Sequence, residues 1–169
     1  MSTDTKPTAD IIEPTEMNRI DPNSILIRPL SRPEDFHSLI QIWLDASIEA
    51  HHFIPESYWR SKAKDVCNIY LPAADTYMAI IEREIVGFYA YYQHRLAALF
   101  VELKMQHRGI GSTLLEDAKN RFSPLEARVY KRNSDAVQFY LHHGFLIQKE
   151  EIDTETKEPE LIITYNPRD

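Results

Sequence analysis

The stretch MQHRGIGSTLLEDAKNRF, residues 105–122, decides how the rest of the sequence is interpreted. From Gly109 onward, apolar residues recur at the spacing of one face of an α-helix, at Ile110, Leu114, Leu115, Ala118 and Phe122. The preceding run RLAALFVEL, residues 95–103, is almost continuously apolar and has the length of a buried strand. The order is therefore a strand, a turn that carries glycine, and a helix.

The start of this helix suits an anionic ligand. Backbone N–H groups in the first turn of a helix have no partner inside the helix and lie at the positive end of its dipole. Gly109 and Gly111 leave these groups uncovered by side chains, so a phosphate could approach closely. Glycine at such a junction can also serve only to make the turn, and this stretch alone leaves both interpretations open. Neither the P-loop, which needs a lysine before its Ser or Thr, nor the three-glycine dinucleotide fingerprint fits.

Length and composition predict one globular domain. The chain has 169 residues, of which 43% are hydrophobic and only 4 are glycine. A net charge of −7 argues against nonspecific binding to nucleic acid or to an anionic membrane. The single cysteine, Cys67, rules out an internal disulfide and a thiolate metal cluster. Because no apolar run approaches the ~18 residues of a membrane helix and no signal peptide is evident, we expect a cytoplasmic protein. We expect it to be a monomer or a homodimer.

The sequence divides into a flexible N-terminal arm, residues 1–23, and a single domain, residues 24–169. The arm is polar and aperiodic and holds three prolines. The domain begins with a strand at 25–30, and it later contains a strand at 125–130 and a helix at 134–144 with Ser134 as its N-cap. The predicted order is β-αα-βββ-α-β-α-β-β. It indicates an α/β (mixed α+β) fold with a central mixed sheet of about seven strands and helices on both faces.

This order and two motifs resemble the GNAT superfamily of acetyl-coenzyme A-dependent N-acetyltransferases over residues 25–165. The first motif is Arg or Gln, two residues, Gly, one residue, then Gly or Ala, and it is filled by Gln106, Gly109 and Gly111. The second is filled by Asn133, Ala136, Phe139-Tyr140 and Gly144-Phe145. Within the superfamily, the chain is similar to small stand-alone bacterial enzymes, several of which are assigned to protein amino groups. That similarity lies in Trp43-Leu44, His51, Phe53-Ile54, Tyr58-Trp59-Arg60 and the strand that begins at Leu96.

The resemblance implies acetyl-coenzyme A as co-substrate. The pantetheine arm would pair with main-chain groups of Leu99, Phe100 and Val101, and a backbone N–H there would support the thioester carbonyl. The pyrophosphate would bind the loop formed by Gln106, His107, Arg108, Gly109, Ile110, Gly111 and Ser112, with Arg108 near the phosphates. Asn133 and Ala136 would also contact the cofactor. We expect no metal, since the pairs His51-His52 and His142-His143 have no carboxylate or cysteine to complete a site.

The resemblance also implies that Tyr140 is the general acid that protonates the departing thiolate, although Tyr140 also fits a helical core stripe. The general base stays open between Glu102 at the end of the strand, a water chain and the His51 loop. Glu49, His51 and Phe53 would border the acceptor site. His51 fits a buried structural histidine equally well.

The function predicted on this basis is transfer of the acetyl group to a primary amine of a protein or peptide, either a lysine or an N-terminal amine, by direct attack. One alternative is acetylation of a small amine, such as an antibiotic, a polyamine or an amino acid. A second alternative is a module that binds acyl-coenzyme A without turnover.

Overall fold

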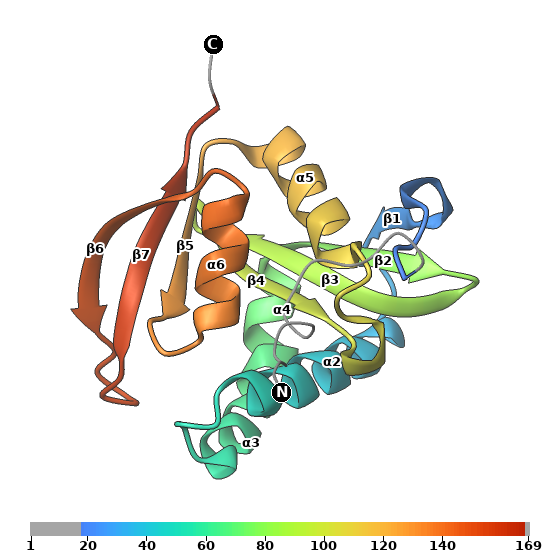
Figure 1. Cartoon of the computed structure of the whole chain (residues 1–169). Helices are drawn as coiled ribbons and strands as arrows, with labels where there is room; N and C mark the ends of the chain where they lie inside the picture. The colour runs from blue at the N-terminus through green and yellow to red at the C-terminus, as the bar shows by residue number, and fades with distance from the viewer. Residues whose placement is uncertain (1–17, 168–169) are drawn as a thin grey trace, which may run out of the picture.

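The structure is a computed structural model, and it describes residues 18–167. The elements follow the predicted order (Figure 1). The strands are β1 (Leu26–Pro29), β2 (Asp75–Ile81), β3 (Glu84–Tyr92), β4 (Arg95–Val101), β5 (Leu125–Tyr130), β6 (Leu146–Ile152) and β7 (Pro159–Tyr165). The α-helices are α2 (Asp35–Ala50), α3 (Glu56–Asp65), α4 (Leu71–Ala73), α5 (Ile110–Phe122) and α6 (Ser134–His142). Short 3₁₀ turns lie at Pro22–Ser24 and Leu103–Met105, and a π-helical segment, Val66–Tyr70, joins α3 to α4.

The seven strands form two antiparallel sheets in place of one mixed sheet. The first sheet has the order β1-β2-β3-β4, and the second has the order β5-β7-β6. A helix connects β4 to β5, which is the connection that brings parallel strands side by side. These two strands are spatial neighbours, but within residues 18–167 no hydrogen-bonded ladder joins them. The strands β4 and β5, the one parallel pair that would have made a single mixed sheet, are therefore not hydrogen-bonded to each other. Each of them is a free edge of its sheet.

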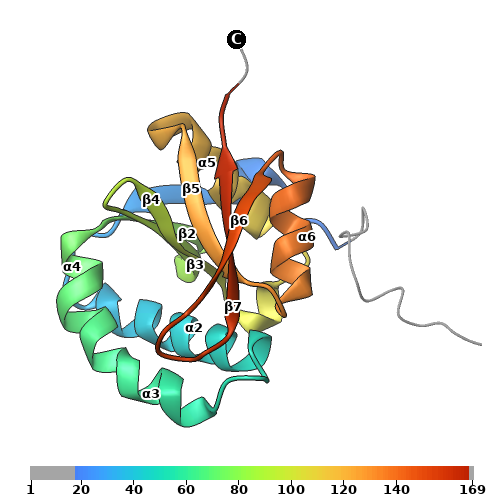
Figure 2. The ribbon, with the colours of Figure 1, turned by 90° about the vertical axis from the view of Figure 1, so that its left-hand side faces the viewer.

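Helices cover both faces of the sheets, as predicted (Figures 1 and 2). On one face, α5 buries Ile110, Leu114 and Leu115 in the same core cluster as Tyr140 of α6. On the other face, Leu39 of α2 lies in a second core cluster with Phe88 of β3. Trp59 of α3 packs on His51 and on Tyr130 of β5. Each helix carries an apolar stripe that it can bury only against a sheet, so the layered arrangement follows from the periodicity.

Helix α5 packs closely on the first sheet because of one glycine. Gly87 in β3 pairs with Val101 in β4, and a Cβ at Gly87 would lie 2.8 Å from the Phe100 carbonyl oxygen and 3.2 Å from Leu114 Cδ1. A side chain at Gly87 would push α5 away from the strand that leads into the glycine turn. The position of the start of α5 relative to β4 therefore depends on the absence of a side chain at residue 87.

The end of the predicted arm contacts the domain. Residues 1–17 lie outside the described residues, so the arm stays a prediction there. Ile20, by contrast, packs against the core under α5, and its backbone N–H donates to the Arg108 carbonyl at 2.9 Å. The end of the predicted arm is thus attached to the domain at Ile20, although its other described residues are exposed.

Candidate active site

The turn between β4 and α5 is held in a fixed conformation by its own residues. His107 and Gly109 both have positive φ, 63° and 94° respectively, so the chain bends through two left-handed residues before α5 begins. The Gln106 side chain donates from Nε2 to the Val101 carbonyl at 3.0 Å, which ties the turn to the end of β4. Gln106, the first residue of the first motif, therefore fixes the turn to the end of β4.

The first turn of α5 fits a phosphate group. Among residues 18–167, no acceptor lies at the backbone N–H groups of Ile110, Gly111 and Ser112. Gly109 is required by its backbone conformation. A Cβ at Gly111, in contrast, would meet Phe139 at an ordinary 3.6 Å. Because the fold would accept alanine at 111, the bare Cα there is better explained by an approaching ligand than by the turn.

The free edge of β4 presents main-chain groups of alternate residues. Glu102 N–H donates to Val86 O at 2.8 Å, and antiparallel ladders alternate, so Phe100 also points its backbone groups toward β3. The N–H and C=O groups of Leu99 and Val101 then point toward β5. The Val101 carbonyl is occupied by Gln106. The Val101 N–H and both groups of Leu99 remain to pair with an extended ligand, whereas the Phe100 N–H is directed away from the gap.

Tyr140 lies on α6, buried between Phe139 and Phe145, with ring centroids 5.3 Å and 5.1 Å away. It is 8% exposed, and no hydrogen bond to its hydroxyl exists among the described residues. Burial raises the pKa of Tyr140 well above its ordinary value of 10. The phenol is therefore a protonated donor at neutral pH, and its hydrogen is not committed to another part of the fold.

His51 and Asn133, which the sequence assigned to different ligands, contact each other. The Ser47 carbonyl can only accept, so His51 Nδ1 carries the hydrogen and donates to it at 2.8 Å. His51 Nε2 then accepts from the Asn133 side-chain amide at 3.2 Å. Burial lowers the pKa of His51, while the Ser47 carbonyl opposes that shift. Asn133 Oδ1 accepts from the Ala136 N–H at 3.3 Å, so Asn133 rather than Ser134 is the N-cap of α6.

The other predicted acceptor residues lie on the same face as α2 and α3. Phe53 packs edge-on to His51 at 5.7 Å and to Tyr130 at 6.0 Å, whereas Glu49 is exposed near the end of α2. The structure thus brings Phe53 and His51 together with β5 and the start of α6, and it leaves Glu49 outside this cluster.

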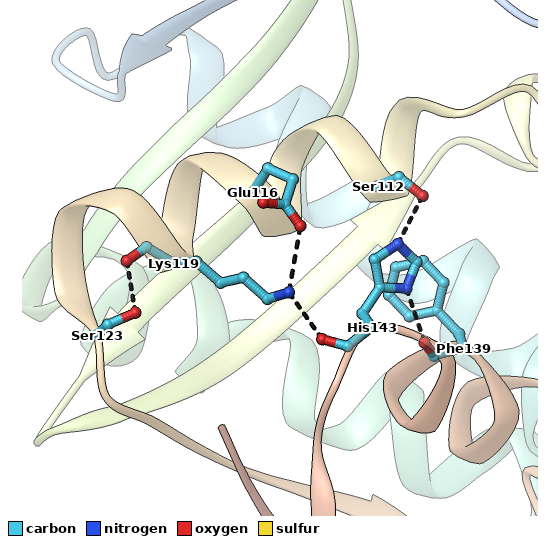
Figure 3. A network of polar contacts seen from close by, with 6 residues as sticks. All are labelled: Ser112, Glu116, Lys119, Ser123, Phe139 and His143. Atoms are coloured by element: carbon cyan, nitrogen blue, oxygen red, sulfur yellow. Dashed lines mark hydrogen bonds and ion pairs between the residues drawn. The ribbon is translucent and has the colours of Figure 1, made fainter. Parts of the chain in front are cut away.

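A polar bridge that no sequence motif predicts connects the first turn of α5 to the end of α6 (Figure 3). His143 donates from Nδ1 to the Phe139 carbonyl at 2.8 Å, which leaves its Nε2 to accept from the Ser112 hydroxyl at 3.0 Å. Lys119 donates to the His143 carbonyl at 2.7 Å and pairs with Glu116 at 3.2 Å. The first turn of α5 is thereby fixed to the end of the helix that carries Tyr140. The sequence signal for this bridge is the pair His142-His143, whose spacing by itself does not indicate a contact with Ser112.

Two further features lie on the α2 and α3 face. A pocket of about 380 Å³ is lined by Trp43, Tyr70, Tyr92 and residues 97–98 of β4. On β7, Glu160 is half-buried without a hydrogen bond or ion pair among the described residues. Burial, and then the charge of Asp153, raise the pKa of Glu160 above its ordinary 4.5. Glu160 was not predicted because β7 has no motif around it.

Comparisons with known proteins now identify the family. A family model described as the acetyltransferase (GNAT) domain matches residues 72–147. The peptidyl-lysine N-acetyltransferase YiaC of Escherichia coli K12 is 32% identical over 141 residues, which cover 83% of this chain and 96% of YiaC. The chain belongs to the GNAT acetyltransferase family. It is therefore an acyltransferase that uses acetyl-coenzyme A, and the predicted family, fold class, enzyme class and co-substrate are confirmed.

Further relatives of this GNAT acetyltransferase agree with that assignment. The peptidyl-lysine N-acetyltransferase YjaB of E. coli K12 is 31% identical over 125 residues, covering 73% of this chain and 84% of YjaB. The solution structure of apo YjaB superimposes with a TM-score of 0.74 at 30% identity, over 83% of this chain and 97% of that one. The PaiA N-acetyltransferase of Thermoplasma acidophilum, solved with coenzyme A, has a TM-score of 0.69 at 22% identity, over 85% and 99% of the two chains, and supports the fold alone.

Two features are absent from residues 18–167 of this GNAT acetyltransferase. No helix in this part of the GNAT domain is long and apolar enough to cross a membrane. No group of three or more His, Cys, Asp or Glu side chains there is arranged to hold a metal ion. The cytoplasmic location and the monomeric or dimeric state stay predictions.

Proposed function

We propose that this GNAT acetyltransferase transfers the acetyl group of acetyl-coenzyme A to the side-chain amine of lysine in proteins or peptides. The observation that carries the proposal is the similarity to YiaC, a peptidyl-lysine N-acetyltransferase, which extends over 96% of that protein. YjaB, a second relative of the same named activity, is matched over 84% of its length. The acceptor is thus inferred from near full-length relatives and not from a single motif.

The proposed cofactor site is the first turn of α5 together with the free edge of β4. The N–H groups of Ile110, Gly111 and Ser112 would bind the pyrophosphate, since they lack acceptors among the described residues. The main-chain groups of Leu99 would pair with the pantetheine arm, which leaves the N–H of Val101 for the thioester carbonyl. Phe100, whose N–H faces β3, would contribute its side chain and not a backbone donor. Asn133 and Ala136, at the start of α6, would also contact the cofactor.

In the proposed mechanism, the neutral lysine amine attacks the thioester carbonyl directly, and Tyr140 donates its hydroxyl proton to the sulfur as the thiolate leaves. The thiol of coenzyme A has a pKa near ~8.5, so a phenol that stays protonated at pH 7 can supply this proton. The Val101 N–H, which points into the gap, would stabilise the negative charge that develops on the carbonyl oxygen.

The amine would enter from the face covered by α2 and α3. A lysine side chain combines an apolar stem with a cationic end, and the aromatic pocket of Trp43, Tyr70 and Tyr92 fits the stem. Glu160 would receive the ammonium group and accept one of its protons, because a carboxyl with a raised pKa is a stronger base than an ordinary one. His51 would hold Asn133 in place, since both of its ring nitrogens already have partners.

The test is a thiol-release assay with three acceptor classes. Peptides with an acetylated N-terminus and one internal lysine should release coenzyme A thiol, and the same peptides with arginine in place of lysine should not. Peptides with a free N-terminus and no lysine, and small amines such as polyamines and amino acids, complete the panel. Release with small amines alone would refute the proposed acceptor, and mass spectrometry of the lysine peptide would show the added acetyl group if the proposal holds.

A further inference from the structure

An arginine outside every motif lies against the cofactor turn. Arg19 Cγ, Cζ and Nε lie 3.5, 3.6 and 3.7 Å from the position that a Cβ at Gly109 would occupy. The guanidinium therefore lies beside the left-handed glycine that precedes the unpaired N–H groups of α5. Within residues 18–167 it makes no hydrogen bond or ion pair.

The segment that carries Arg19 is held in place on both sides of it. Ile20 N–H donates to the Arg108 carbonyl at 2.9 Å, and Arg108 Nε donates to the Asn18 carbonyl at 3.1 Å. The Ile20 side chain packs into the core under α5. These contacts fix the backbone of residue 19 beside the turn, so the exposed Arg19 side chain starts from an anchored position next to Gly109.

The same contacts direct Arg108 away from the role that the motif suggested. Its Nε is used by the Asn18 carbonyl, and its Nη1 lies 3.6 Å from Met105 Sδ. Arg108 is therefore occupied with the N-terminal segment and the turn. Among residues 18–167, Arg19 has all of its donors available, whereas Arg108 already uses Nε and one Nη1 hydrogen.

We propose that Arg19 binds the pyrophosphate of acetyl-coenzyme A and that Arg108 is its positioning residue. This rests on the proposed placement of the pyrophosphate at the first turn of α5. A polyanionic cofactor approaches a chain of net charge −7, so a cation fixed beside the turn offsets the repulsion where the ligand binds. Arginine also suits phosphate because its planar donors can bind two oxygens at once.

The test measures binding of coenzyme A to the full chain by calorimetry, without turnover. Arg19→Gln should weaken the affinity about ten-fold at low salt, as expected for one charge-assisted contact at an exposed site. The difference should shrink as salt screens the charge. Lys64→Gln, which removes one positive charge from exposed α3 on the opposite face, should leave the affinity within about two-fold. Unchanged or tighter binding by Arg19→Gln would overturn the proposal.

Two further measurements locate the contact. Arg19→Gln should weaken binding of dephospho-coenzyme A by the same factor; loss of the difference with that ligand would move the contact to the 3′-phosphate and refute the assignment to the pyrophosphate. If Arg108 acts through Arg19, the double variant Arg19→Gln, Arg108→Gln should bind no more weakly than the weaker single variant. Additive losses would mean that Arg108 binds phosphate itself.

The two proposals fail separately. If the wild-type protein binds coenzyme A with the predicted dependence on Arg19 but acetylates no lysine peptide, the proposed acceptor is wrong and the role of Arg19 stands. If lysine peptides are acetylated while Arg19→Gln binds like wild type, only the role of Arg19 is wrong.

Discussion

Replacing Tyr140 by phenylalanine should separate catalysis from folding in this enzyme. The substitution keeps the ring between Phe139 and Phe145 and removes only the hydroxyl. No hydrogen bond among the described residues is lost with it, so the free energy of unfolding should change by less than about 1 kcal/mol. The proposed proton donor to the leaving thiolate is lost, and general-acid catalysis contributes about 10²–10⁴ in rate. We therefore expect kcat to fall by this factor, which corresponds to about 3–5 kcal/mol of barrier.

Tyr89→Phe is the matched control. The Tyr89 hydroxyl donates to Asp117 Oδ2 at 2.6 Å, deep under α5. Removing a hydrogen bond to a charged partner costs about 1.5–3 kcal/mol, so this variant should melt several degrees earlier and keep its kcat. The two tyrosine variants should thus show opposite effects on kcat and on Tm.

The assay is thiol release from acetyl-coenzyme A at saturating lysine peptide, after pre-steady-state measurements have shown that chemistry limits turnover. Coenzyme A affinity of Tyr140→Phe should stay within about three-fold of wild type, because the lost hydroxyl acts on the leaving group and not on ground-state binding. The pKa of Tyr140 is raised, so the phenol stays protonated as pH rises and should not limit activity on the alkaline side up to about pH 9. A Tyr140→Phe enzyme that retains a third or more of kcat would leave Tyr140 as a core residue only.

The remaining predictions concern four positions. Gly87→Ala should lower the free energy of unfolding by about 1–3 kcal/mol in denaturant titrations, because its Cβ would lie 2.8 Å from the Phe100 carbonyl oxygen; an unchanged midpoint would contradict the close packing of α5. Gly111→Asp should lose most coenzyme A affinity in calorimetry while its circular dichroism stays native, whereas Gly111→Ala should keep its Tm; full affinity in the folded Asp variant would remove the turn from the cofactor site. His51 has a folded pKa below its ordinary 6.5, so the unfolded chain binds the proton first as pH falls. The stability contributed by neutral His51 is present above pH 6.5 and is lost below it. The fall in Tm from pH 7 to pH 5 should therefore be shallower in His51→Gln than in the wild type. Parallel profiles of Tm against pH would show that His51 does not contribute. Glu160→Gln should raise Tm, since it removes a half-buried carboxylate near Asp153, but lower kcat/KM for lysine peptides; unchanged kcat/KM would exclude Glu160 from the acceptor site.

The spacing of apolar residues predicted the helices and strands well wherever one regular period runs through the segment. The apolar stripe from Ile110 to Phe122 became α5, and the strand expected at residues 125–130 became β5. The two motif glycines also lie where the sequence placed them, at the start of α5. These features depend on neighbouring residues along the chain, and such information is present in the sequence itself.

The predictions that differ from the structure depend on contacts between distant segments. The split into two sheets arises because β4 and β5 diverge, which no pattern within either strand encodes. The N-cap of α6 is Asn133 because its side chain also donates to His51. Arg19 lies in an aperiodic stretch whose position is set by Arg108, about ninety residues away in the sequence.

The gap between β4 and β5 has a consequence for the protein without its cofactor. Each strand presents a row of unsatisfied main-chain groups at a sheet edge, and such edges are templates for pairing with a strand of another molecule. Along β4, Gln106 covers only the Val101 carbonyl, so most of that edge stays open. At the proposed cofactor site, an extended ligand in the gap would supply the missing strand. Coenzyme A would then shield this edge from pairing with another molecule, and we expect the protein to self-associate less when coenzyme A is bound.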